Sequence, residues 1–139
     1  MTAPQVRRVL ETALYCDDHE ACARFYEALL GRERLLTGDR LIALDAGDGS
    51  VLLLFRRGAS ARPLETPGGT IPGHDGQGPM HLAFAIGRDE VGAWEARLTE
   101  LHVALESRVR WDRGGESLYF RDPEGRSVEL ATPGTWSTW

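Results

Sequence analysis

The spacing of apolar residues in the first half of the chain predicts one helix among four strands. Residues 9–16 are rich in strand-forming side chains and end at two aspartates, which suit a helix N-terminus because they accept hydrogen bonds from its free N–H groups. From His19 to Leu30 the apolar residues recur three and four positions apart, and Gly31 follows, which is typical of an amphipathic helix and its end. Three short strands are then expected, at 34–37, 41–45 and 51–56.

The second half repeats this order of elements. A strand is expected at 80–86, and a helix runs from Arg88 to about Leu101 with one apolar face. Strands at 103–109, 117–121 and 127–131 follow. Because the order strand–helix–strand–strand–strand occurs twice, we predict an α+β fold of two βαβββ modules. Two such modules can form a curved sheet around a central cavity, with the helices on the outside. The order of elements alone is equally compatible with an α+β sandwich that has no cavity.

Residues 58–79 interrupt the pattern with six glycines and four prolines. No regular element is expected there, and a loop of this length in a compact domain is usually functional or a linker. His74 and Asp75 are its candidates for covering a site, although loop polarity alone predicts exposure. We therefore predict one domain over residues 1–139, with module one at 7–57 and module two at 79–131, joined by the 58–78 loop.

Three of the predicted strands carry a glutamate or a histidine on the face opposite their bulky apolar residues. Successive side chains of a strand alternate between its two faces, which places Glu11, His81 and Glu129 in this position. Two carboxylates and an imidazole that converge on one cavity make a good ligand set for a divalent metal ion. If the sheet does not curve, the three residues never meet. Solvated glutamates and a hydrogen-bonded histidine then explain the pattern.

Charge and composition exclude several classes of function. The chain has 16 Lys and Arg against 21 Asp and Glu, so it lacks the basic excess that binds nucleic-acid phosphates. No apolar run approaches the length of a membrane-spanning helix, and the N-terminus lacks the apolar core of a signal peptide. The spacing of Cys16 and Cys22 matches no metal or redox motif. We therefore expect a cytoplasmic protein that acts on a small molecule and binds neither nucleic acid nor membrane.

Several segments carry a family resemblance. They are residues 11–18 with 23–31, residues 78–86 and residues 119–133. The last segment contains the pattern Phe-x-Asp-Pro-x-Gly-x-x-x-Glu, which is the most specific of them. Together they resemble the vicinal oxygen chelate superfamily, which includes glyoxalase I, bleomycin-resistance proteins, fosfomycin-resistance transferases and extradiol dioxygenases.

This resemblance implies paired βαβββ modules and one divalent metal ion, which could be Mn, Ni, Fe, Mg or Zn. The implied ligands are Glu11, His81 and Glu129, the residues that strand alternation also selects. Two departures from the family stand out: the first ligand is most often histidine, and glyoxalase I normally has a fourth ligand, a glutamate, where residues 51–55 hold no donor. A Glu–His–Glu set favours Mn²⁺, Mg²⁺, Ni²⁺ or Fe²⁺ over a thiolate-type zinc site.

Two functions follow from these residues. The first is a metal-dependent enzyme that chelates adjacent oxygens of a small substrate, by lyase, isomerase, transferase or dioxygenase chemistry. In that enzyme we expect Glu129, Tyr15 and Tyr119 to take part in catalysis, the tyrosines by orienting the substrate. The alternative is a metal-free protein of the bleomycin-resistance type, which sequesters a small molecule at a dimer interface. A homodimer is expected because an open curved sheet leaves edges and apolar surface for a second copy to cover.

Overall fold

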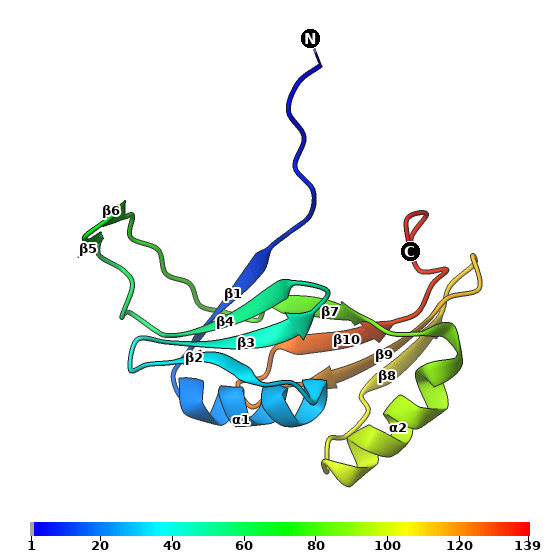
Figure 1. The fold of residues 1–139 in the computed structure, drawn as a ribbon. Helices are drawn as coiled ribbons and strands as arrows, with labels where there is room; N and C mark the ends of the chain where they lie inside the picture. The colour runs from blue at the N-terminus through cyan, green and yellow to red at the C-terminus, as the bar shows by residue number, and fades with distance from the viewer. Residues whose placement is uncertain (1) are drawn as a thin grey trace. The chain divides into compact units, whose positions relative to one another are not determined.

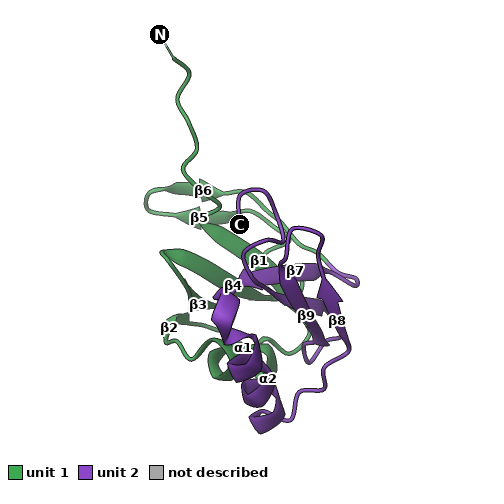
Figure 2. Ribbon diagram, turned by 90° about the vertical axis from the view of Figure 1, so that its right-hand side faces the viewer, with its two compact units in different colours: residues 1–76 green, residues 77–139 purple. Residues whose placement is uncertain are grey.

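The computed structural model describes residues 2–139, and these divide into two compact units (Figure 2). One unit ends at Gly76 and the other begins at Gln77. Each contains a four-stranded sheet of mixed strand direction and one α-helix (Figure 1). The prediction of two βαβββ modules is therefore confirmed.

In the first unit a parallel strand pair is extended by two antiparallel neighbours. The strand order is β1-β4-β3-β2, with β1 parallel to β4. Because a parallel pair needs a long crossover, α1 and two strands separate β1 from β4 in the chain. The elements are β1 (Glu11–Cys16), α1 (His19–Leu30), β2 (Arg34–Thr37), β3 (Leu41–Gly47) and β4 (Ser50–Arg56).

The helix α1 begins and ends where the sequence predicts. The Asp18 carboxylate accepts a hydrogen bond from the Ala21 N–H at 3.0 Å, which satisfies one of the free donors of the first turn. Gly31 takes a left-handed conformation with φ of +62° and closes the helix through a bond from its N–H to the Glu27 carbonyl. The helix lies on the sheet through its buried residues Cys22, Ala23, Tyr26 and Leu29.

The second unit repeats this topology, with the order β7-β10-β9-β8 and with β7 parallel to β10. The helix predicted from Arg88 begins as a short 3₁₀ helix (η1, Arg88–Glu90) and continues as an α-helix. The strand predicted at 103–109 is shorter than expected, because only its last part pairs with a neighbour. The other elements are β7 (His81–Ala85), α2 (Val91–Glu100), β8 (Ser107–Arg110), β9 (Glu116–Arg121) and β10 (Ser127–Ala131).

The glycine- and proline-rich segment contains a small hairpin, so the expectation that it holds no regular element is wrong. Strands β5 (Leu64–Thr66) and β6 (Gly69–Ile71) pair antiparallel. The Thr66 hydroxyl donates to the Gly69 carbonyl at 2.6 Å and closes the turn between them. Strands of three residues are too short to show an alternating pattern, so the sequence gives no signal for them.

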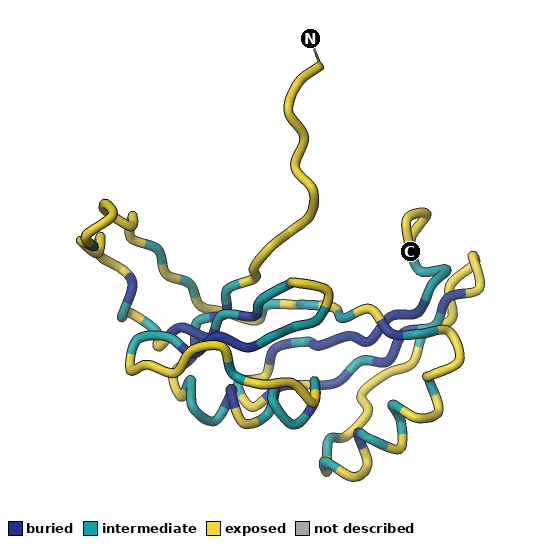
Figure 3. The backbone as a smooth tube through the Cα atoms, viewed as in Figure 1, coloured by how far each residue is buried: buried dark blue, intermediate teal, exposed yellow. Residues whose placement is uncertain are grey.

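The central strands of each sheet are the most buried parts of the chain (Figure 3). In β10 the apolar Val128 and Leu130 are almost fully buried, and Glu129 between them is only 7% exposed. A carboxylate in such a position needs polar partners, because an unpaired buried charge is costly. None of the helices within residues 2–139 is long and apolar enough to span a membrane.

Candidate metal centre

The parallel pairing of β7 and β10 brings two of the three predicted ligands together. His81 lies opposite Ser127 in this register and Glu129 lies opposite Ala83, so the two side chains share one face of the sheet. The His81 Nε2 atom is 3.2 Å from the Glu129 Oε1 atom. The histidine side chain is half exposed, whereas that of the glutamate is almost completely buried. The second unit thus contains an imidazole and a carboxylate in direct contact.

The hydrogen bond between His81 and the Ser127 carbonyl shows which ring nitrogen carries the hydrogen when the ring is neutral. Its Nδ1 atom is 3.0 Å from the Ser127 carbonyl oxygen, which can only accept. Nδ1 therefore carries the hydrogen, and Nε2 of a neutral ring is left with a lone pair directed at a carboxylate oxygen. Two acceptors 3.2 Å apart need a cation between them, either a proton on Nε2 or a metal ion. This donor pair fits a divalent ion.

Two further side chains extend the contacts of Glu129. Its Oε2 atom lies 2.5 Å from the Ser117 hydroxyl, and that hydroxyl accepts a hydrogen bond of 2.8 Å from the Trp111 indole. An indole N–H can only donate, so the hydroxyl hydrogen of Ser117 points to Glu129. Neither residue stands out in the sequence as a partner of a ligand. Strand alternation does place Ser117 and Tyr119 on one face, but the register that sets them beside Glu129 is visible only in the structure.

Tyr119 lies directly opposite Glu129 in the antiparallel pair of β9 and β10. Its ring stacks on the His81 ring with a centroid distance of 6.2 Å. Burial raises the pKa of the Tyr119 phenol above its ordinary value, and the charge of Glu129 and a hydrogen bond to it raise the pKa further. Tyr119 therefore keeps its proton at neutral pH and can donate a hydrogen bond in this site.

Glu11 and Tyr15, the other predicted site residues, belong to the first unit. Glu11 is the exposed first residue of β1, as His81 is of β7. The strand registers also make Leu53 the counterpart of Glu129, because Ala13 pairs with Leu53 as Ala83 pairs with Glu129. The first unit therefore offers one donor where the second offers two. Leu53 lies within residues 51–55, which hold no donor side chain.

Tyr15 is held by the 58–78 segment. Its hydroxyl is 2.7 Å from the His74 Nδ1 atom, and both rings contact Phe55. Burial raises the pKa of Tyr15, and the nearby charge of Asp75 raises it further. Tyr15 is thus a protonated phenol on the same face of β1 as Glu11, since both occupy odd positions of the strand.

The two βαβββ modules define a class of α+β protein that is built from a repeated unit. Residues 8–130 match the family model of the Glyoxalase/Bleomycin resistance protein/Dioxygenase superfamily, and the chain belongs to this superfamily. The resemblance noted in the sequence is therefore confirmed.

The curated relatives of the chain include metallothiol transferases. It is 28% identical to metallothiol transferase FosB of Lysinibacillus sphaericus (strain C3-41) over 134 residues, which cover 95% of the chain and 84% of that protein. It is 40% identical to the FosB protein of Bacillus licheniformis over 53 residues, or 37% of the chain. That shorter match covers 34% of the B. licheniformis protein, so the chain spans about a third of this relative.

Solved structures with the same fold include a lyase, whereas the curated relatives are transferases. The crystal structure of lactoylglutathione lyase from Agrobacterium tumefaciens has 34% sequence identity and a TM-score of 0.86, and covers 96% of this chain and 99% of its own. An integron cassette protein from the Halifax Harbour sewage outfall metagenome has 21% identity and a TM-score of 0.71, covering 91% of this chain and 99% of its own. This second likeness supports the fold alone.

Proposed function

We propose that this protein is a metal-dependent enzyme that binds adjacent oxygen atoms of a small substrate at a divalent ion held by Glu11, His81 and Glu129. The observation that carries the proposal is the contact between His81 and Glu129, in which two atoms that can bind a metal ion, Nε2 and Oε1, lie 3.2 Å apart. The names of the relatives support an enzyme, since one is a metallothiol transferase and another a lactoylglutathione lyase.

The type of donor also supports a metal role. Two carboxylates and one neutral imidazole balance a 2+ charge and offer hard oxygen and borderline nitrogen ligands, which suit Mn²⁺, Ni²⁺, Fe²⁺, Mg²⁺ and Zn²⁺. A divalent ion in this set would act as a Lewis acid that stabilises negative charge on a substrate oxygen. Glu11 belongs to the proposed set because it is the first-unit counterpart of His81, at the same position of its edge strand.

The protonated groups of the chain supply the remaining chemistry. The Tyr119 phenol lies beside Glu129, hydrogen-bonds to it and keeps its proton at neutral pH, so its one hydrogen can turn from Glu129 to an oxygen of a bound substrate and orient that substrate. Tyr15, at a different position of the first unit, has the same protonation state and its hydroxyl is held by His74. We assign positioning of the substrate to both tyrosines. A substrate screen distinguishes lyase, isomerase, transferase and dioxygenase chemistry.

Metal binding tests the proposal most directly. Protein purified without a metal-chelating tag is analysed for bound elements, and Mn²⁺ is titrated into the metal-free protein by calorimetry. Replacing Glu129 with Gln keeps the shape of the side chain and removes its charge. We expect Glu129→Gln and Glu11→Gln each to lower Mn²⁺ affinity at least tenfold, since even residues that only orient ligands change affinity by roughly 10–100-fold.

The control is Glu100→Gln, a substitution at an exposed glutamate of α2, which should leave Mn²⁺ affinity unchanged. An affinity unaltered by Glu129→Gln would contradict the assignment of Glu129. An affinity unaltered by Glu11→Gln alone would restrict the site to the second unit. A protein that binds no divalent ion would favour the other function, a small-molecule binding protein of the bleomycin-resistance type.

A further inference from the structure

A line of hydrogen bonds leads from the surface of the second unit to Glu129. The Trp111 side chain is partly exposed, whereas Ser117 is completely buried. The indole donates to the serine hydroxyl and the hydroxyl donates to Oε2 of Glu129, at 2.8 and 2.5 Å. The Ser117 hydroxyl therefore occupies Oε2, whereas Oε1 lies on the side of His81.

We propose that Trp111 and Ser117 are positioning residues that hold Glu129 as a one-oxygen metal ligand. This inference rests on the proposed function. The physical reason is that a carboxylate can bind a cation through one oxygen or through both. A short hydrogen bond to Oε2 competes with the cation for that oxygen and fixes the rotation of the carboxylate, so Oε1 alone faces the position beside His81 Nε2.

The backbone around Trp111 fixes the position of its indole. The backbone N–H of Trp111 donates to the Gly115 carbonyl at 2.8 Å, and the backbone carbonyl of Trp111 accepts from the Gly114 N–H at 2.9 Å. These bonds close the turn that joins β8 to β9, and Ser117 follows as the second residue of β9. The indole therefore reaches the serine from a tight turn, which suits a group that must hold a fixed direction.

The first unit shows that the fold does not require this arrangement. Ser117 pairs with Ala131, two residues after Glu129. At the equivalent place in the first sheet Leu41 pairs with Phe55, two residues after Leu53. In the first sheet Leu41 and Leu53 thus stand at the positions that Ser117 and Glu129 occupy in the second. The same strand order forms with either pair, so the hydrogen-bonded pair belongs to the ligand site.

Two variants test the role of these residues in the metal-free protein titrated with Mn²⁺. Ser117→Ala removes the donor to Glu129, and we expect Mn²⁺ affinity to fall by about 10–100-fold, the range for residues that orient metal ligands. Trp111→Phe removes only the indole donor, so a smaller loss in the same direction is expected. The matched controls are Ser107→Ala on β8 and Trp136→Phe at a tryptophan that is 71% exposed, both with unchanged affinity.

An infrared spectrum separates positioning from a structural role. The gap between the antisymmetric and symmetric carboxylate stretches is wide when one oxygen binds a metal and narrow when both bind. The Glu129 bands are identified by their loss in Glu129→Gln. We expect a wide gap in the Mn²⁺ complex of the unsubstituted protein and a narrow gap in that of Ser117→Ala, with the thermal midpoint of the metal-free protein as the check on folding.

The outcomes distinguish this inference from the function on which it rests. Unchanged Mn²⁺ affinity and an unchanged carboxylate gap in Ser117→Ala would overturn the inference and leave the metal site standing. Failure of the unsubstituted protein to bind Mn²⁺ would overturn both. If Ser117→Ala unfolds, Trp111→Phe decides, because the partly exposed indole can be replaced without opening the core. Equal affinities of Trp111→Phe and Trp136→Phe would then overturn the inference.

Discussion

Gly76 lies against the ring of Tyr15, and a side chain of any size is excluded there. A Cβ atom at this position would be 2.7 Å from Cδ2 and 3.0 Å from Cε2 of Tyr15. The Gly76 carbonyl also accepts a hydrogen bond of 2.8 Å from Arg57. The absence of a side chain at Gly76 therefore allows the 58–78 segment to lie close enough for His74 to reach the Tyr15 hydroxyl.

We predict that Gly76→Ala destabilises the protein by about 1–3 kcal/mol, the usual cost of forcing extra atoms into a packed site. Chemical denaturation measures this change in the free energy of unfolding. The control is Gly92→Ala in α2, where a Cβ meets no atom within 4 Å and alanine is the better helix former. Gly76→Ala with the stability of the unsubstituted protein and an intact Tyr15–His74 hydrogen bond by NMR would show that the loop has another anchor.

At the scale of single residues, the sequence predicted the proposed metal ligands better than the residues that form hydrogen bonds with them. His81 and Glu129 were identifiable because polar side chains in strands stand out against an apolar row. Ser117 and Trp111 were not, because a serine and a tryptophan near a turn are ordinary in any sequence. Their importance comes from the register between β9 and β10, which the residue types leave undetermined.

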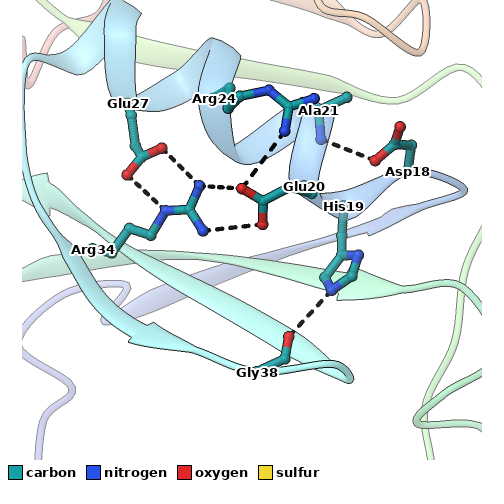
Figure 4. A network of polar contacts seen from close by, with 8 residues as sticks. All are labelled: Asp18, His19, Glu20, Ala21, Arg24, Glu27, Arg34 and Gly38. Atoms are coloured by element: carbon teal, nitrogen blue, oxygen red, sulfur yellow. Dashed lines mark hydrogen bonds and ion pairs between the residues drawn. The ribbon is translucent and has the colours of Figure 1, made fainter.

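Among the elements, α1 is fastened to β2 by one arginine (Figure 4). Arg34 of β2 donates to Glu20 at 2.6 Å and to Glu27 at 2.7 Å, and both glutamates belong to α1. These glutamates are seven residues apart, which is two helical turns and so one face of the helix. The Arg34 side chain is only 21% exposed, so these bonds are less screened than ordinary surface pairs.

We predict that Arg34→Ala lowers the free energy of unfolding by about 1–2 kcal/mol at neutral pH, since charge-assisted hydrogen bonds contribute more than exposed ion pairs. The matched control is Arg24→Ala in α1. Its guanidinium is 3.7 Å from Glu20 and its side chain is 64% exposed, so its removal should cost under about 0.5 kcal/mol. Equal effects of the two substitutions in urea denaturation would contradict the fastening role of Arg34.

The same ion pairs predict a pH dependence. The hydrogen bond from Arg34 is the main reason why the pKa of Glu20 lies below its ordinary value of 4.5. A lowered pKa in the folded state stabilises the protein above the unfolded-state value, and this contribution disappears as the pH falls through the folded-state pKa. The stability difference between the unsubstituted protein and Arg34→Ala should therefore be constant above pH 4.5 and shrink below it. A difference that persists in acid would mean that packing of the arginine stem is responsible.

Elements with local end signals were predicted best. Asp18 and Gly31 mark both ends of α1, and the structure has the helix between them. The strand predicted at 103–109 fared worse, because Val103 to Leu105 are apolar but are not part of any strand. Instead the Val103 N–H bonds back to the Leu98 carbonyl at the end of α2. An apolar run indicates burial, whereas strand pairing depends on distant residues.

At the scale of the whole molecule, the repeat separates scaffold from chemistry. Both units have an edge strand parallel to its neighbour and two antiparallel strands beyond it. In the first sheet the positions equivalent to Glu129 and Tyr119 hold Leu53 and Ala43, which pair with each other. The second unit thus carries polar groups on a topology that the first unit forms with apolar residues at the same positions. Substitutions at the polar positions of the second sheet are therefore expected to change the site and leave the strand order unchanged.

Exposed apolar side chains lead to a prediction about assembly. Val6 is 91% exposed, Val9 73% and Leu10 56%, and all three lie in the segment before β1, an edge strand of its sheet. We predict that the chain forms a homodimer in which this segment is covered, because apolar surface and free strand edges favour association with a second copy. Sedimentation equilibrium at micromolar concentration should give twice the chain mass of 15.4 kDa.

Because each chain carries a net charge of −5, an apolar dimer should persist or tighten at high ionic strength, where repulsion is screened. Val9→Asp should shift the mass toward the monomer without lowering stability, whereas Ala96→Asp on the exposed side of α2 should not. A monomeric mass for the unsubstituted protein would refute the dimer, and a dimer unaffected by Val9→Asp would place the interface elsewhere.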